Sequence, residues 1–126
     1  MAFTILVIDD DEKLNRLLKR FLKDFGYEVF SAVDAGQGLK KIRTVAPDLI
    51  ILDITMPVMT GIEMLGKLKA ENDLKDIPVI MLTAESGKEN VMQIVKMGVK
   101  DYIVKPFKGE QLIERAKNIL KLRPVE

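Results

Sequence analysis

The strongest constraint on the fold of this chain is the regular alternation of five short segments of strand character with five segments of helical periodicity. The strand segments are Phe3–Ile8, Glu28–Val33, Leu49–Asp53, Ile77–Thr83 and Lys100–Val104. Continuous runs rich in Ile and Val, such as the first and third, are typical of strands buried on both faces. In the intervening segments apolar residues recur every three or four positions, which is typical of amphipathic helices.

The helices are expected at about residues 12–25, 34–45, 61–72, 88–97 and 110–122. Asp10 or Asp11 can cap the start of the first helix, and Gly26 lies where a left-handed residue ends it. Five βα units in succession imply right-handed crossovers and a mostly parallel sheet with helices on both faces. We therefore expect one α/β domain over residues 1–126, a doubly wound three-layer sandwich with no output domain.

The composition excludes several classes of function. The chain has no Cys and no His, so disulfides, structural zinc sites and a Ser-His-Asp triad are absent. Basic and acidic residues number 20 and 19 and form no basic block, which argues against direct binding of nucleic acid. No segment is apolar over the roughly 20 residues that a membrane span needs, and no signal peptide is expected. We expect a cytoplasmic protein without a membrane partner.

Polar residues of three chemical kinds follow the strand segments. Asp9 and Asp10 follow the first, Asp53 ends the third, Thr83 ends the fourth, and Lys105 follows the fifth. Carboxyl ends of parallel strands share one edge of a sheet, and open α/β sheets bind ligands at that edge. Three carboxylates gathered there would repel one another, and a hard cation such as Mg²⁺ would resolve the conflict.

This set of groups suits phosphoryl transfer, which requires neutralised phosphoryl oxygens and a nucleophile in line. Asp53 is the candidate carboxylate nucleophile, while Mg²⁺ and Lys105 would neutralise charge. The hydroxyl of Thr83 and the backbone N–H of Ala84 would donate hydrogen bonds to phosphoryl oxygens. The residues themselves therefore predict a Mg²⁺-dependent aspartyl phosphorylation site.

Four segments resemble, in order and spacing, the signatures of the receiver domains of two-component response regulators. They are VIDDDE at the first strand, LDITMPVMTG around Asp53, LTAE at Thr83 and YIVKPF around Lys105. The resemblance covers the whole chain and implies a flavodoxin-like (βα)5 fold with parallel strand order 2-1-3-4-5. It also implies that Asp53 accepts a phosphoryl group from a histidine kinase or phosphotransfer protein, as a phosphoacceptor and not as a turnover enzyme.

The same resemblance implies a set of magnesium ligands. Asp10 would bind Mg²⁺ directly, and Asp9 would do so directly or through water. Asp53 and the backbone carbonyl of Thr55 would complete the protein ligands.

The resemblance further implies a switch. Thr83 would move toward the phosphoryl group, and Tyr102 would swing inward behind it. This movement would remodel the face made by the fourth helix, fifth strand and fifth helix (the α4-β5-α5 face), where an unknown downstream protein would dock. The Lys105-Pro106 peptide bond would be cis, and the chain would be a monomer or a phosphorylation-linked dimer.

Two other functions fit part of the sequence. A haloacid-dehalogenase-like phosphatase also uses an Asp nucleophile at a strand end. Such enzymes resemble one another in having a second Asp two residues after the nucleophile, and this chain has Thr55 at that position. A phosphorylation-independent docking module would be expected to lack one of the acids, the Thr or the Lys. None of these is missing, so both alternatives are disfavoured.

Overall fold

The computed structural model describes residues 3–56, 58–83 and 88–121. Strands and helices alternate along the chain, and each predicted element is present. In chain order they are β1 (Thr4–Ile8), α1 (Glu12–Asp24), β2 (Glu28–Ala32), α2 (Ala35–Val45), β3 (Leu49–Asp53), α3 (Gly61–Lys69), β4 (Val79–Thr83), α4 (Lys88–Lys96), β5 (Asp101–Val104) and α5 (Gly109–Lys121).

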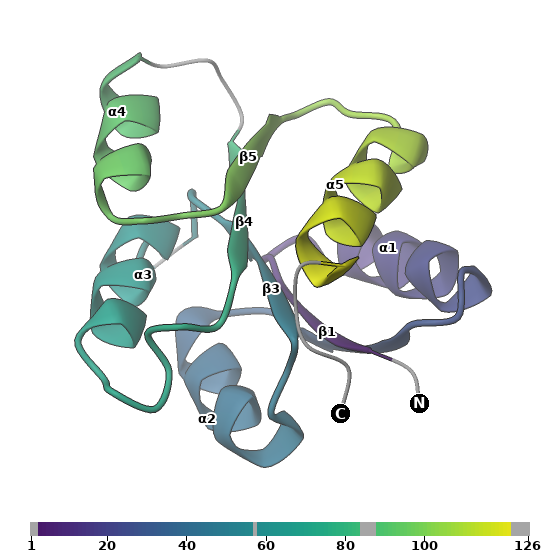
Figure 1. Cartoon of the computed structure of the whole chain (residues 1–126), viewed down its shortest axis with the longest axis horizontal. Coiled ribbons are helices and arrows are strands. Elements are labelled where there is room, and N and C mark those ends of the chain that lie inside the picture. Colours follow the sequence, from purple (N-terminus) through teal and green to yellow (C-terminus); the bar gives the residue numbers. More distant parts are fainter. Residues whose placement is uncertain (1–2, 57, 84–87, 122–126) are drawn as a thin grey trace.

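The five strands form one parallel sheet in the order β2-β1-β3-β4-β5, as the resemblance implied. Helices α1 and α5 cover one face of the sheet, and α2, α3 and α4 cover the other (Figure 1). The chain moves outward from β1 to β2 and then returns to place β3 on the other side of β1. The strand order therefore reverses between β1 and β3, which is where open α/β sheets bind ligands.

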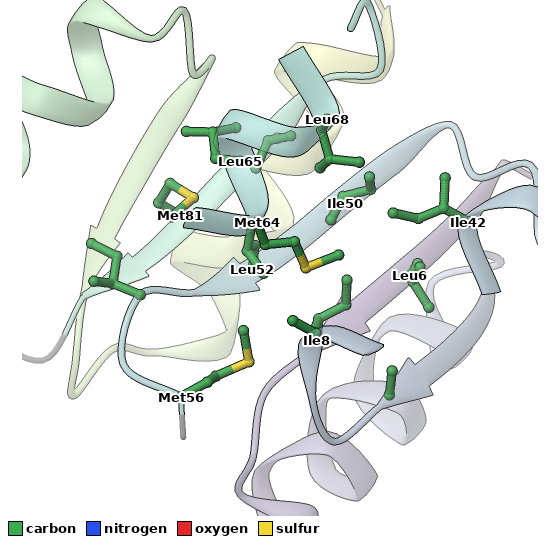
Figure 2. Close-up of a cluster of buried hydrophobic side chains, with 14 of the residues drawn as sticks. Leu6, Ile8, Ile42, Ile50, Leu52, Met56, Met64, Leu65, Leu68 and Met81 are labelled. Atoms are coloured by element: carbon green, nitrogen blue, oxygen red, sulfur yellow. The ribbon is translucent and has the colours of Figure 1, made fainter. Parts of the chain in front are cut away.

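Alternate side chains of the central strands supply two separate hydrophobic cores. Leu6 and Ile8 of β1 point toward α2 and α3, where Met64 and Leu65 are fully buried (Figure 2). Met56, in the loop after β3, belongs to the same core and is a packing residue. The opposite core combines the other strand residues with the buried faces of α1 and α5. Because β3 and β4 are buried along their whole length, a one-residue slip would misplace every side chain.

Local sequence signals fix where the helices begin and end. Asp11 caps α1 by accepting hydrogen bonds from two backbone N–H groups of the first turn, and Gly26, with φ of 91°, follows the end of α1. Thr60 and Glu63 form a capping box that starts α3. Asp11 follows the acids at the end of β1, and Thr60 begins α3 at the end of the loop that follows Asp53 of β3.

Two element boundaries differ from the prediction by more than one residue. Helix α3 ends at Lys69 instead of near Asn72, and the chain turns there, with the backbone N–H groups of Leu74 and Lys75 donating to the carbonyl of Glu71. Strand β4 begins at Val79, since Pro78 has no N–H to donate to the sheet.

Within the described parts of the chain, no helix is both long enough and apolar enough to span a bilayer.

Candidate functional site

Three carboxylates meet at the carboxyl edge of the sheet. Asp9, Asp10 and Asp53 each offer an oxygen, and these oxygens lie within 4.8 Å of one another. Strands β1 and β3 are paired with Ile8 opposite Leu52, so the acids that follow leave the sheet side by side. The structure thus brings together the three acids that the sequence singled out as carboxylate ligands of a metal.

Asp9 is completely buried and held on all sides. Its Oδ1 accepts a hydrogen bond from the backbone N–H of Asp11 at 2.9 Å, and its Oδ2 accepts one from Nζ of Lys105 at 2.8 Å. Its own backbone N–H donates to the carbonyl of Ala32 at 3.1 Å. A buried charge is tolerated when it is paired and hydrogen-bonded in this way. The carboxylate of Asp9 is therefore buried and held in one place beside Asp53 and Lys105.

Lys105 reaches the acids from the end of β5. Its backbone N–H donates to the carbonyl of Thr83, and its Nζ lies 3.4 Å from Oδ1 of Asp53. The peptide bond to Pro106 is cis, as the resemblance implied. Burial lowers the pKa of the ammonium, but the hydrogen bond to Asp9 and the charges of Asp53 and Asp9 together raise this pKa above its ordinary value. Lys105 is therefore a permanent cation beside Asp53.

Asp53 is the acid whose protonation the site perturbs most clearly. Burial and the negative charge of Asp9 raise its pKa from 3.8 to about 6, against the opposing effects of Lys105 and a backbone hydrogen bond from Thr55. The side chain is nearly buried, with 5% of its surface exposed. At neutral pH the carboxylate is still mainly ionised. Asp53 thus combines nucleophilic character with an environment that favours removal of its charge.

The remaining predicted residues lie around these groups. Thr83 is buried at the end of β4, one residue beyond Leu82, the register partner of Asp53. Tyr102 of β5 is half-buried against the core that contains Met64. Thr55 is exposed, and its backbone carbonyl remains a predicted metal ligand. Ala84, whose N–H was predicted to contact the phosphoryl group, lies outside the described residues.

Two residues that support the site were not predicted from the sequence. Asn15 of α1 is buried and donates to the backbone carbonyls of Asp9 and Ala32. Gly61 begins α3 so close to β3 that a Cβ atom there would overlap the carbonyl oxygen of Asp53. Asn15 could have been found from the sequence, because it is a polar residue on the same helical stripe as the buried Leu18.

The donor set fits a hard divalent cation. Each carboxylate contributes oxygen, Asp10 is exposed to solvent, and the other two acids are buried. Mg²⁺ prefers a few carboxylates and keeps several waters in an octahedral shell. The two buried acids can supply fixed carboxylate ligands, and the exposed position of Asp10 leaves room for the waters of the ion.

The fold and site define a doubly wound α/β domain with clustered acids at its switch point and a lysine from β5 beside them. A model of the response regulator receiver domain matches residues 5–117, and the chain belongs to that family. Phosphorylation-dependent signalling is the function of the family, whose members are phosphoacceptors and interact with histidine kinases.

Named relatives agree with this assignment. The chain is 38% identical to the chemotaxis protein CheY1 of Helicobacter pylori, over 92% of this chain and 95% of CheY1. It is 38% identical to the phosphate regulon transcriptional regulatory protein PhoB of Pseudomonas aeruginosa, over 94% of this chain and 52% of PhoB. The chain thus spans about half the length of PhoB and of several other curated relatives.

Solved structures show the same fold. The chemotaxis protein CheY4 of Vibrio cholerae superposes with a TM-score of 0.89 at 32% identity, covering 94% of this chain and 99% of that one. A CheY-like receiver domain protein of Methanospirillum hungatei gives 0.89 at 34% identity, covering 96% and 95%.

Proposed function

We propose that this chain takes a phosphoryl group from the phosphohistidine of a histidine kinase, or of a phosphotransfer protein, onto Asp53. The observation that carries this proposal is the position of Nζ of Lys105, 3.4 Å from Oδ1 of Asp53 and beside the three clustered carboxylates. Phosphoryl transfer is catalysed chiefly by positioning and by charge neutralisation, and these groups supply both.

In the proposed transfer, a carboxylate oxygen of Asp53 forms a bond to phosphorus while the P–N bond of the donor breaks. The electron pair of the broken bond stays on the imidazole nitrogen, which takes up a proton. The product on Asp53 is an acyl phosphate. Lys105, the hydroxyl of Thr83 and the backbone N–H of Ala84 are the proposed donors to the phosphoryl oxygens.

The proposed ligands of Mg²⁺ are Asp9, Asp10, Asp53 and the backbone carbonyl of Thr55. The bound ion would supply positive charge to the phosphoryl oxygens. Because Asp9 already pairs with Lys105, it is the least free of these ligands, which favours its contact through water. Asp10 is exposed to solvent and its carboxylate lies beside those of Asp9 and Asp53, which favours a direct contact.

The proposed output is a change at the α4-β5-α5 face. Thr83 and Tyr102 are the proposed switch residues, since Thr83 lies next to the site and Tyr102 is only half-buried on the edge strand. On α4, Met92 and Val95 expose 59% and 57% of their surface, which suits contact with a downstream protein. A monomer or a phosphorylation-linked dimer, and a cytoplasmic location, are part of the same proposal.

The chain is proposed to act as a phosphoacceptor without multiple turnover. A phosphatase of the haloacid dehalogenase type would require an acid two residues after Asp53, and Thr55 stands there. Sustained hydrolysis of phosphate esters would contradict this part of the proposal.

The direct test is incubation with acetyl phosphate and Mg²⁺, followed by intact-mass measurement. Wild type is expected to gain the mass of one phosphoryl group, and Asp53→Ala is expected to gain none. Asp11→Ala is the matched control, because it removes a neighbouring acid that only caps α1. A wild type left unmodified by small phosphodonors and by histidine kinases would contradict the proposal. Partner binding unchanged by Asp53→Ala would instead favour a docking module.

A further inference from the structure

Asn15 links helix α1 to the ends of two strands at the base of the site. Its Nδ2 donates one hydrogen bond to the backbone carbonyl of Asp9 at 2.8 Å and another to the carbonyl of Ala32 at 3.1 Å. Both hydrogens of the amide are used, and the residue is 3% exposed. The amide therefore ties α1 to the carboxyl ends of β1 and β2.

Packing alone does not account for an asparagine at this position. Within the described part of the chain, Oδ1 of Asn15 is buried and has no hydrogen-bond partner. A buried acceptor without a partner destabilises a fold, and a leucine, whose side chain has the same branched heavy-atom skeleton, would avoid that loss. The same helix face already carries the buried Leu18 and Leu22. Only the two donated hydrogen bonds distinguish Asn15 from these neighbours.

Those hydrogen bonds act on the peptide unit that joins Asp9 to Asp10. The backbone N–H of Asp9 is held by Ala32, and its carbonyl is held by Asn15. A peptide unit is planar, so fixing the Asp9 carbonyl also fixes the direction in which the chain enters Asp10. Among the described residues the carboxylate of Asp10 makes no hydrogen bond or ion pair of its own. Its location beside Asp9 and Asp53 thus depends on the backbone that Asn15 holds.

We infer that Asn15 is a positioning residue for the acidic cluster: it fixes the Asp9–Asp10 peptide so that Asp10 is presented to a divalent cation. This inference rests on the proposed function and names a residue that touches neither the cation nor the phosphoryl group. Groups that orient metal ligands typically change metal affinity by about 10-fold to 100-fold when they are removed. Loss of the amide is therefore expected to weaken Mg²⁺ binding by at least about tenfold.

The test titrates the full chain with Mg²⁺ alone by calorimetry and records the urea unfolding midpoint of each variant. Asn15→Leu removes both donors and the unpaired acceptor while keeping the branched heavy-atom skeleton, and Asn15→Ser keeps one donor. Leu22→Val is the matched control, because it perturbs the buried face of the same helix without touching the acids.

The expected result is a dissociation constant raised at least about tenfold in Asn15→Leu and by less in Asn15→Ser, whatever the change in unfolding midpoint. Leu22→Val is expected to bind Mg²⁺ like the wild type although it unfolds at lower urea. Dissociation constants of both Asn15 variants within about twofold of wild type would overturn the inference. A wild type that binds no Mg²⁺ would contradict the proposed function itself, and so the two failures are distinguishable.

Discussion

The ammonium of Lys105 lies 2.8 Å from Oδ2 of Asp9, across a separation of 96 residues in the sequence. Asp9 is fully buried, while the Lys105 side chain keeps 25% of its surface exposed. The pair joins the end of β5 to the end of β1 and leaves Nζ close to Asp53. One lysine therefore stabilises the site in the fold and also provides the cation that the proposed chemistry needs.

Removal of that cation is expected to destabilise the protein. Lys105→Met would leave Asp9 as a buried charge without its partner, and breaking buried pairs costs about 3–5 kcal/mol. Because Lys105 is partly exposed, we expect a loss of about 2 kcal/mol, below that range. Urea unfolding of wild type and Lys105→Met in EDTA measures this loss of unfolding free energy. Lys100→Met, at an exposed position, should change stability by no more than about 0.5 kcal/mol. Equal stability of the two variants would contradict the structural role of the pair.

Asp53 is expected to make the metal-free protein less stable as pH rises from about 4 to about 7. Its pKa is about 6 in the fold against an ordinary 3.8, so the folded state binds more protons than the unfolded state over this interval. Stability falls with pH wherever the folded state binds more protons, and about two pKa units correspond to about 3 kcal/mol.

Asp53→Asn lacks this titration. In EDTA the variant should exceed wild type in unfolding free energy by about 2–3 kcal/mol near pH 8, and the gain should shrink toward zero near pH 4. Urea unfolding at a series of pH values measures this difference. A gain that is independent of pH, or a variant less stable than wild type near pH 8, would show that burial and Asp9 do not perturb Asp53 in the predicted direction.

Two adjacent acids are expected to separate metal binding from helix capping. Asp10→Ala should abolish most of the stabilisation that Mg²⁺ gives to wild type, which is about 2.7 kcal/mol at one hundred times the dissociation constant. Asp11→Ala should lower stability by about 1 kcal/mol through loss of the α1 cap, yet keep the full response to Mg²⁺. The difference in unfolding temperature between Mg²⁺ and EDTA, measured for each variant, distinguishes the loss of a metal ligand from the loss of a helix cap. An unchanged Mg²⁺ response in Asp10→Ala would remove Asp10 from the proposed ligands.

Two glycines of α3 are expected to respond to alanine in opposite directions. A Cβ atom on Gly61 would overlap the Asp53 carbonyl and lie 2.8 Å from Cα of Ile54, so the β3–α3 loop would have to move. We expect Gly61→Ala to cost about 3 kcal/mol and to slow phosphorylation. At Gly66 the nearest outside atom, Cε of Met97, is 3.7 Å away, so Gly66→Ala should gain about 0.5–1 kcal/mol. A neutral Gly61→Ala in urea unfolding would contradict this close approach.

Most of the fold followed from hydrophobic pattern. Runs such as Leu49–Asp53 are buried on both faces, and their pattern differs clearly from the three-to-four periodicity of the helices. The end of α3 was not predictable in the same way, because residues near Glu71 also contact Arg43, which lies on a different helix. Pairing across 28 residues leaves no local signal in the sequence.

The acids, Thr83 and Lys105 could be placed from their positions at strand ends, since parallel strands bring those ends to one edge. The contacts that support these residues could not be predicted from the sequence in this way. Gly61 matters because its backbone meets that of Asp53, and no composition or periodicity encodes that approach. Asn15 was detectable as a polar residue on a buried helical stripe, but its partners are backbone carbonyls that any sequence would supply.

The central claim is that the phosphoryl group forms an acyl phosphate on Asp53, and chemical trapping tests it most directly. After reaction with acetyl phosphate and Mg²⁺, borohydride reduces an acyl phosphate to an alcohol and converts the modified aspartate to homoserine. Peptide mass mapping is predicted to find homoserine at position 53 and to find aspartate retained at Asp9 and Asp10. Homoserine at either of those acids, or none at position 53 in a protein that has gained phosphoryl mass, would contradict the account.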